Sequence, residues 1–383
     1  SEIGQCTKLM HFDVRNSTLD GSIPSELGLL TKLTYLDLWE NSLVGSIPSE
    51  IGQCRGLMFL NVWENSLDGS IPSEIGQCKG LQYMSLGNNA LDGSIPSEIS
   101  QNTELTTLAL GDNNLDGSIP IDIGKLKKLE YLAIDHNNLT GTIPSEIGHC
   151  SKLSSIGLYA NYLHGSIPSD ISALTSLAYL GIYDNLLTGS IPSEIGQNTE
   201  LTTLVLGDIN LDGSIPSEIG KLTKLEYLAI DRNKLTGTIP NEIGQCTELT
   251  SLSLFENNGS IPNEIVALVN LTLMGFYDNS LTGTIPREIG ALKKLNYLGI
   301  FNNSLTGTIP SELGQCTELT KLSLSSNSLT GPIPSEISSL TLLESLFLFD
   351  NDLNGTMPES LCNQGTSIYV CGIECPCCDS YYC

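Results

Sequence analysis

The chain has 383 residues and a formal net charge of −26, from 43 acidic residues against 17 lysines and arginines. A strongly acidic surface opposes phosphate backbones and anionic lipids, which excludes nucleic acid as a partner. The sequence lacks an apolar stretch of the length that crosses a bilayer, so we expect no membrane insertion within this chain.

Residues 1–8 match the second half of a repeated unit, and fifteen further repeats start from Leu9. The period is 24 letters, with the consensus L-x-x-L-x-L-x-x-N-x-L-x-G-x-I-P-x-x-I-G-x-x-x-x, and fifteen of the seventeen prolines fall in one column of it. A fixed period of this length predicts a solenoid in which each unit buries its apolar face against its neighbours. Because the chain begins inside a repeat, we expect that further repeats or a cap precede it in the intact protein.

Each repeat contains the elements of one coil. Alternating apolar letters in L-x-x-L-x-L predict a short strand with one buried face, as at Leu36 and Leu38. The asparagine that follows, such as Asn41, is expected to form an amide ladder where the strand turns. The proline of the I-P-x-x-I segment suits the first position of a helical turn. The glutamate two residues after it, such as Glu26, suits the positive end of that turn.

The segment G-x-I-P-x-x-I-G resembles the plant-type leucine-rich repeat of receptor-kinase ectodomains and polygalacturonase-inhibiting proteins. The resemblance implies an α/β solenoid, a right-handed superhelix with a continuous parallel sheet on its concave face and short 3-10 or helical turns outside. It covers residues 1–361, which we predict to be the solenoid domain, and residues 362–383 are predicted to be a disulfide-rich cap.

The last segment of the chain is unusually rich in cysteine. Three disulfides there would cover the final coil, which implies an oxidising compartment, and a zinc site is the disfavoured alternative because the spacing lacks paired C-x-x-C arms. This cluster resembles the caps of secreted diatom leucine-rich repeat proteins. The predicted disulfide cysteines are Cys362, Cys371, Cys375, Cys377, Cys378 and Cys383.

Six other cysteines occupy one column inside the repeats, where other repeats place leucine. We therefore predict free buried thiols that act as small apolar side chains, with a bridge between Cys54 and Cys78 as the alternative. Six N-x-S/T sequons support a secretory route and are candidate glycosylation sites: Asn16, Asn138, Asn258, Asn270, Asn302 and Asn354.

The solvent side of each main strand is set by the letters two, four, six and seven places after the first leucine. Aromatic and acidic residues gather there most densely in the second to fourth repeats, and we predict a ligand-binding surface on the concave face. The proposed residues are Tyr35, Asp37, Trp39, Glu40, Phe59, Asn61, Trp63, Glu64 and Tyr83. Trp39 and Trp63 share one column, so their rings are expected side by side about 5 Å apart.

Further aromatic residues in the same columns are secondary candidates: Tyr131, Tyr159, Tyr179, Tyr183, Tyr227, Phe255, Tyr277 and Phe301. The alternative interpretation is structural, because exposed aromatics also stack from coil to coil along a sheet. The surrounding carboxylates favour an extracellular protein or a basic peptide as the partner, with a glycan as the alternative.

A longer repeat overlies the short one, because residues 101–152 and 197–248 are nearly the same text. The two segments lie four repeats apart, so we infer that a block of four coils was duplicated. A feature that occurs in both blocks can be inherited and need not be a second binding site.

The sequence offers no arrangement that is typical of an enzyme. Four dispersed histidines, no nucleophile elbow and no phosphate loop predict a non-catalytic protein with no cofactor and no metal site. We expect an extracellular recognition module, either secreted or on the outer side of the cell surface. An adhesive or matrix protein is the alternative, and inhibition of a secreted glycan-degrading enzyme is a third option.

Overall fold

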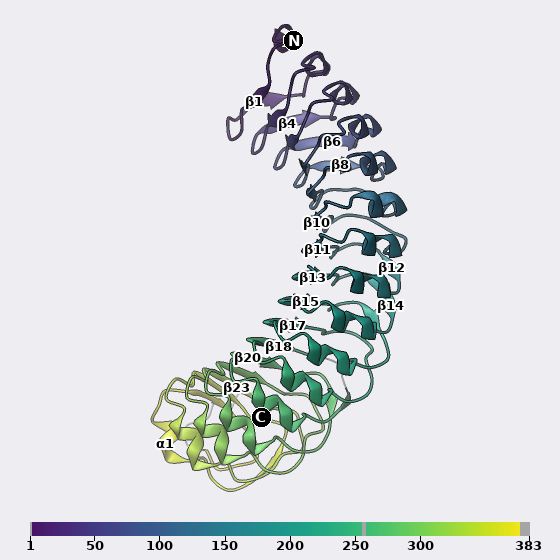
Figure 1. Ribbon diagram of the computed structural model, residues 1–383. Helices are drawn as coiled ribbons and strands as arrows, with labels where there is room; N and C mark the ends of the chain where they lie inside the picture. The colour runs from purple at the N-terminus through teal and green to yellow at the C-terminus, as the bar shows by residue number, and fades with distance from the viewer. Residues whose placement is uncertain (1, 255–257, 376–383) are drawn as a thin grey trace. The chain divides into compact units, whose positions relative to one another are not determined.

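The computed structural model describes residues 2–254 and 258–375, except for the side chains of 258 and 259. The chain divides into two compact units, Ser1–Thr188 and Gly189–Cys383. Both units repeat the same coil, which is a main strand, a turn, in most coils a second short strand, and a 3-10 helix. In the first unit the 3-10 helices lie on the side opposite to the main strands (Figure 1).

Within each unit the main strands pair in parallel and in chain order, each in register with the same letters of the next repeat, as Tyr35 with Phe59. In the first unit they are β1 (His11–Asp13), β3 (Tyr35–Asp37), β5 (Phe59–Asn61), β7 (Tyr83–Ser85), β9 (Thr107–Ala109), β10 (Tyr131–Ala133), β11 (Ser155–Gly157) and β13 (Tyr179–Gly181). In the second unit they are β15 (Thr203–Val205), β17 (Tyr227–Ala229), β18 (Ser251–Ser253), β20 (Leu273–Gly275), β22 (Tyr297–Gly299), β23 (Lys321–Ser323), β25 (Ser345–Phe347) and β27 (Ser367–Tyr369). The predicted α/β leucine-rich repeat solenoid is confirmed.

A second set of strands follows the turns and forms small separate sheets. These strands are β2 (Asp20–Gly21), β4 (Ser42–Gly45), β6 (Ser66–Ser70), β8 (Ala90–Asp92), β12 (His164–Gly165), β14 (Leu186–Gly189), β16 (Asn210–Leu211), β19 (Asn258–Gly259), β21 (Ser280–Leu281), β24 (Thr330–Gly331) and β26 (Asp352–Leu353).

Short helices close each coil. The 3-10 helices are η1 (Glu2–Gln5), η2 (Ser25–Leu29), η3 (Ser49–Gln53), η4 (Ser73–Gln77), η5 (Ser97–Gln101), η6 (Ile121–Lys125), η7 (Ser145–His149), η8 (Ser169–Ala173), η9 (Ser193–Gln197), η10 (Ser217–Lys221), η11 (Asn241–Gln245), η12 (Asn263–Ala267), η13 (Arg287–Ala291), η14 (Ser311–Gln315) and η15 (Ser335–Ser339). The α-helix α1 (Glu359–Cys362) ends the series. Proline stands one place earlier than expected, at the N-cap with an extended backbone, as Pro48 does before η3.

The core of each coil is built from the inward letters of the repeat, such as Leu36, Leu60 and Val62, which are almost completely buried. The predicted asparagine ladder is confirmed. The Asn137 amide donates to the carbonyl oxygens of Leu110, Ile134 and Asp135 and accepts from the N–H of Leu115, so it satisfies backbone groups of adjacent coils.

The cysteines inside the repeats are free thiols, as predicted, and no bridge joins Cys54 to Cys78. Each buried thiol lies close to a carbonyl oxygen of the preceding coil, as Cys150 does to Ile123 at 3.2 Å. Cys6 is an exception to the prediction because it is exposed.

The boundary that we predicted at residue 361 does not coincide with the end of the sheet. Strand β27 pairs with β25 and adds one more main strand inside the expected cap. Cys362, Cys371 and Cys375 are disulfide-bonded, whereas Cys377, Cys378 and Cys383 lie outside the described residues. None of the described helices is long and apolar enough to cross a membrane.

Candidate functional site

The candidate site lies on the outward side of the main strands. We call this surface the main-strand face and define it as the letters two, four, six and seven places after the first leucine of each repeat. Parallel pairing in register brings equal letters of consecutive repeats to about 4.8 Å from one another. Each letter therefore forms a column of side chains, and the chemistry of the face changes along those columns.

Aromatic rings stack along the first column. His11, Tyr35, Phe59 and Tyr83 are stacked in sequence with centroids 4.0, 4.3 and 4.5 Å apart. Shorter stacks join Tyr159 to Tyr183, Tyr277 to Phe301 and Phe347 to Tyr369. The structural alternative that the sequence allowed, coil-to-coil stacking, is thus present on this face, and these rings have much of their surface covered by each other.

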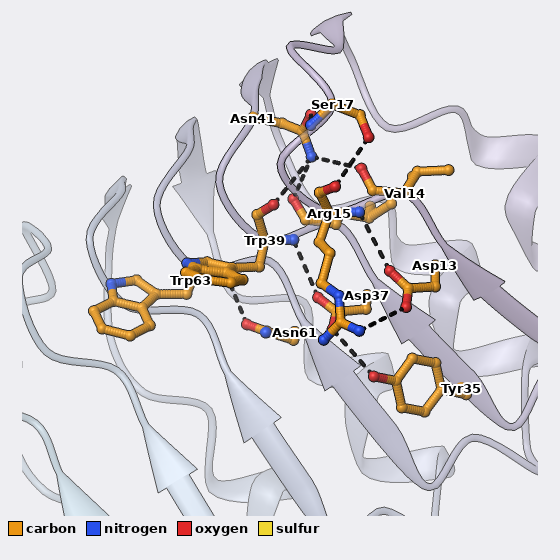
Figure 2. A network of polar contacts seen from close by, with 11 residues as sticks. Asp13, Val14, Arg15, Ser17, Tyr35, Asp37, Trp39, Asn41, Asn61 and Trp63 are labelled. Atoms are coloured by element: carbon orange, nitrogen blue, oxygen red, sulfur yellow. Dashed lines mark hydrogen bonds and ion pairs between the residues drawn. The ribbon is translucent and has the colours of Figure 1, made fainter.

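Asp37 is the centre of a polar network at the start of the face (Figure 2). Its carboxylate accepts hydrogen bonds from the Tyr35 hydroxyl at 3.1 Å and from the backbone N–H of Trp39 at 3.2 Å. The Arg15 guanidinium lies 3.7 Å from the same carboxylate and 3.3 Å from Asp13. Burial, and then the bond to Asp37, raises the pKa of the Tyr35 hydroxyl.

Two of the nine proposed binding residues do not face solvent. Asp37 is only 1% exposed and Asn61 is 8% exposed. Both side chains turn back to the backbone two residues later, where Asn61 accepts the N–H of Trp63 at 3.2 Å. The prediction that they are accessible is wrong, because a short amide or carboxylate in this column is satisfied inside its own strand and covered by the larger neighbours.

The two tryptophans differ in their surroundings. Trp63 is 43% exposed, whereas Trp39 is half-buried and its indole N–H has no hydrogen-bond acceptor among the described residues. We expected the two indoles side by side, and none of the ring contacts recorded for the described residues joins them, so that expectation stays a prediction. Figure 2 shows the two side chains on neighbouring coils. The Trp63 ring lies next to Gly87 of the following coil, which has no side chain. A Cβ added to Gly87 would lie 3.6 Å from Cδ1 of Trp63.

A hollow of about 290 Å³ opens beside Trp63. Small residues make its floor, because Ser85, Ala109 and Ala133 occupy the four-letter column and glycines occupy the six-letter column in two successive coils. Aromatic rings and carboxylates make its walls. The lining residues are Trp63, Tyr83, Ser85, Gly87, Thr107, Ala109, Gly111, Asp112, Tyr131, Ala133 and Asp135.

Asp135 lies at the far wall of the hollow and is 8% exposed. Burial raises the pKa of its carboxyl group, and a hydrogen bond from Tyr159 acts in the opposite direction. Its carboxylate would stand 3.0 Å from a Cβ on Gly111, so that glycine is what gives the carboxylate room. The charge on Asp112 also raises the pKa of Asp135, which indicates that the two acids are near neighbours without full compensation.

The second copy of the four-coil block repeats this pair of acids in the second unit. Asp208 and Asp231 stand where Asp112 and Asp135 stand in the first copy. Burial again raises the pKa of Asp231. Here Arg232 contacts Asp208 through both carboxylate oxygens, at 3.1 and 3.2 Å, and the first copy has His136 in place of that arginine.

The secondary candidates do not form one site. Tyr131 and Tyr227 are the most exposed of them, at 43% and 41%, and Tyr131 belongs to the hollow. Tyr179 folds back over Gly181 of its own strand, and Tyr297 does the same over Gly299. Lys321 lies 5.5 Å from the rings of Tyr297 and Phe347. Phe255 lies outside the described residues.

The seven-letter column has a backbone conformation that sequence reasoning missed. The described residues in it have φ near +50°, as do Glu40 and Glu64 among the proposed residues. The signal was available, because asparagine and aspartate are frequent there and tolerate this region. The side chains of this column therefore project from a fixed turn at one edge of the main-strand face.

Most of the sequon asparagines are accessible. Asn16, Asn138, Asn302 and Asn354 are exposed, Asn270 is half-buried with its amide bonded to Thr247, and the Asn258 side chain lies outside the description. Over residues 2–254 and 258–375, no group of three histidine, cysteine, aspartate or glutamate side chains is arranged to hold a metal ion.

Family comparisons agree with the coil geometry. A leucine-rich repeat region model matches residues 159–276, and a leucine-rich repeat model matches residues 32–54, 80–102, 104–126, 128–150, 294–316 and 318–340. Among curated proteins, no sequence matches.

Several solved structures resemble this chain. The plant peptide hormone receptor RGFR1, solved in complex with RGF2, is 38% identical with a TM-score of 0.92, over 94% of this chain and 60% of that one. The ectodomain of the Arabidopsis receptor kinase HAESA, in complex with an extended IDA peptide hormone, is 31% identical with a TM-score of 0.90, over 97% and 63%. A leucine-rich repeat protein of Leptospira interrogans is 30% identical with a TM-score of 0.75, over 100% and 94%. The chain thus spans about three fifths of the length of the plant receptor chains.

Proposed function

Because this chain belongs to the leucine-rich repeat proteins, we propose that it is a non-catalytic module that binds a peptide or protein on its main-strand face. The observation that carries this proposal is the hollow beside Trp63, the place where large exposed rings, a small-residue floor and carboxylates meet. A pocket with apolar walls and a few placed polar groups is the usual form of a ligand site.

The similar plant receptors give the proposal its ligand class. Two of them were solved with peptide hormones bound, and this chain matches 60% and 63% of their lengths with TM-scores of 0.92 and 0.90. We extend peptide binding to this chain because it has the same fold and an exposed main-strand face. The negative charge of −26 favours a basic peptide through electrostatic attraction.

We further propose that the protein acts outside the cell, either secreted or as part of a surface protein. Disulfide-bonded Cys362, Cys371 and Cys375 support an oxidising compartment. Four exposed asparagines in N-x-S/T sequons support the same location, because glycosylation needs accessible acceptors in the secretory route.

An adhesive or matrix role is the second candidate. The stacked rings of His11, Tyr35, Phe59 and Tyr83 favour it, because they already satisfy one another and need no ligand to explain them. Trp63 and Tyr131 separate the two functions, since neither ring takes part in a stack of the described residues and both are more than 40% exposed.

The deciding experiment selects ligands from a random peptide library displayed on phage, with the purified chain as bait. Recovered peptides are then measured by calorimetry against the chain, Trp63→Ala, Tyr131→Ala and the control Tyr162→Ala. Tyr162 is 53% exposed but lies outside the main-strand face, so its loss should leave binding unchanged. We expect Trp63→Ala to weaken binding at least tenfold, since such aromatic anchors dominate interfaces.

Two results would overturn the proposal. One is a library that yields no enriched peptide, which would favour the adhesive role. The other is a set of peptides that bind Trp63→Ala and Tyr131→Ala as well as they bind the parent, which would move the site away from this face. Thermal melting of each variant shows whether it is folded before binding is compared.

A further inference from the structure

The duplicated block provides an internal comparison for the hollow. In the second unit, Arg232 projects from its φ-positive turn and pairs with Asp208 of the preceding coil. The molecule therefore supplies its own guanidinium to the acid in this column. An exposed ion pair of this kind contributes little to the free energy of unfolding. What it indicates is that an acid in this position can bind a guanidinium group.

The first unit has the same acids without that cation. His136 replaces the arginine and makes an edge contact with the Tyr159 ring at 5.2 Å. No lysine or arginine of the described chain lies within ion-pair distance of Asp112. Asp112 and the buried Asp135 therefore face the same hollow without a lysine or arginine partner for Asp112 among the described residues, and the charge of His136 is the one cationic influence on the pKa of Asp135.

The walls of the hollow suit a planar cation. Trp63 and Tyr131 present exposed rings, and a guanidinium gains energy when it stacks on such a ring. The volume of about 290 Å³ is at the small end for a ligand site, which fits one side chain of a peptide better than a whole small molecule. A divalent metal ion is disfavoured, because only two carboxylates line the hollow and Asp135 already accepts a hydrogen bond from Tyr159.

We infer that the hollow between Trp63 and Asp135 binds an arginine side chain of the peptide ligand, with Asp112 and Asp135 as the anionic partners and Trp63 as the stacking surface. This inference rests on the proposed peptide-binding function and adds the identity of one recognised side chain. The second copy takes no such ligand, because Arg232 occupies its acid.

The test compares two probes, N-acetyl-arginine amide and its neutral isostere N-acetyl-citrulline amide, by protein NMR titration. We expect shifts for the arginine probe at signals of Trp63 and Ala109, and affinity at least fivefold lower for the citrulline probe. His136→Arg should abolish arginine binding, because it recreates the pair of Arg232 with Asp208 in the first unit. Asp112→Asn should weaken it, and Asp208→Asn is the matched control that should not.

Equal binding of both probes, or arginine binding that survives His136→Arg in a folded variant, would overturn the inference. The peptides from the library selection separate this outcome from failure of the proposed function. Peptides that need Trp63 but tolerate arginine-to-citrulline replacement would leave peptide recognition standing and remove the arginine site. Absence of any peptide binding would remove both.

Discussion

The indole of Trp63 lies over Gly87 of the next coil, with 3.6 Å between its Cδ1 and the position that a Cβ on Gly87 would take. The change from tryptophan to glycine in one column is what opens the hollow. A side chain at Gly87 would also meet the carbonyl oxygen of Gly111 at 2.8 Å, so the backbone of this region is closely packed. The site therefore depends on the missing side chains of Gly87 and Gly111 as much as on the aromatic rings around them.

The difference between the two tryptophans can be read by fluorescence. In Trp39→Phe the remaining Trp63 is 43% exposed, so its emission should lie at longer wavelength and be quenched strongly by acrylamide. In Trp63→Phe the remaining half-buried Trp39 should emit at shorter wavelength with weaker quenching. Equal quenching constants in the two folded variants would contradict the described exposure.

Close coil contact at the helix column predicts a large effect of a single methyl group. A Cβ on Gly52 would stand 2.5 Å from the carbonyl oxygen of Glu74, which belongs to the next coil and cannot rotate away. We expect Gly52→Ala to lower the free energy of unfolding by about 1–3 kcal/mol through overpacking. Gly56→Ala in the same coil is the control, since its nearest atom is 3.6 Å away. Denaturant unfolding measures both, and similar losses would refute the steric explanation.

The asparagine ladder predicts a contrast between two adjacent residues. Asn137 is 6% exposed and bonds to four backbone groups, so Asn137→Ala should cost about 1–3 kcal/mol by leaving some of them unsatisfied. Asn138→Ala changes an exposed amide and should cost less than about 0.5 kcal/mol. The measurement is urea unfolding of unglycosylated protein, and a loss of the same size at Asn138 would argue against the ladder.

The buried thiols predict a decline of stability in alkaline solution. Burial raises the pKa of Cys150 to about 11, whereas an unfolded thiol titrates near 8.5. The folded state therefore holds the proton longer, and its contribution is complete below pH 8.5 and falls as pH rises toward 11. We expect Cys150→Leu, which places the residue found at Leu126 and Leu174 in this column, to make that decline shallower.

Thiol labelling provides the control for this titration. At pH 8 in the native state, Ellman's reagent should react with exposed Cys6 and leave Cys54, Cys78, Cys150, Cys246 and Cys316 unmodified until the chain is unfolded. Rapid native labelling of the buried set, or an alkaline profile unchanged by Cys150→Leu, would contradict the account.

The fold was predictable because its causes repeat. Nearly every coil has the same inward leucines and the same asparagine, with Ser17 and Ile209 as the two departures from the asparagine, so the period identified the strands and the ladder. The accessible side chains were predicted less well, because their positions depend on neighbours that change from coil to coil. Asp37 is buried by a bond to its own strand, and the Trp63 ring lies next to a glycine of the following coil, which has no side chain.

The residues that line the hollow have known places in the repeat, but the sequence alone did not predict that they surround a hollow. Ala109, Gly111 and Ala133 carry no functional chemistry, and their importance lies in the volume that they leave free. Asp112 and Asp135 occupy columns that the sequence assigns to the outward side of the strands, yet only the structure separates an exposed acid from a buried one with a raised pKa. The duplicated block made it possible to compare His136 with Arg232, and a single repeat offers no such comparison.

The φ-positive turn has an energetic cost in each of the coils for which the structure describes it. A non-glycine residue such as Asp112 or Asp184 in this region is strained by roughly 1 kcal/mol, and glycine there would relieve the strain while it removed the side chain. A substitution by glycine at these positions would therefore raise stability but remove a side chain that recognition could use. Because the backbone of the turn stays the same whichever residue occupies it, new binding specificities can arise by single substitutions that leave the scaffold unchanged.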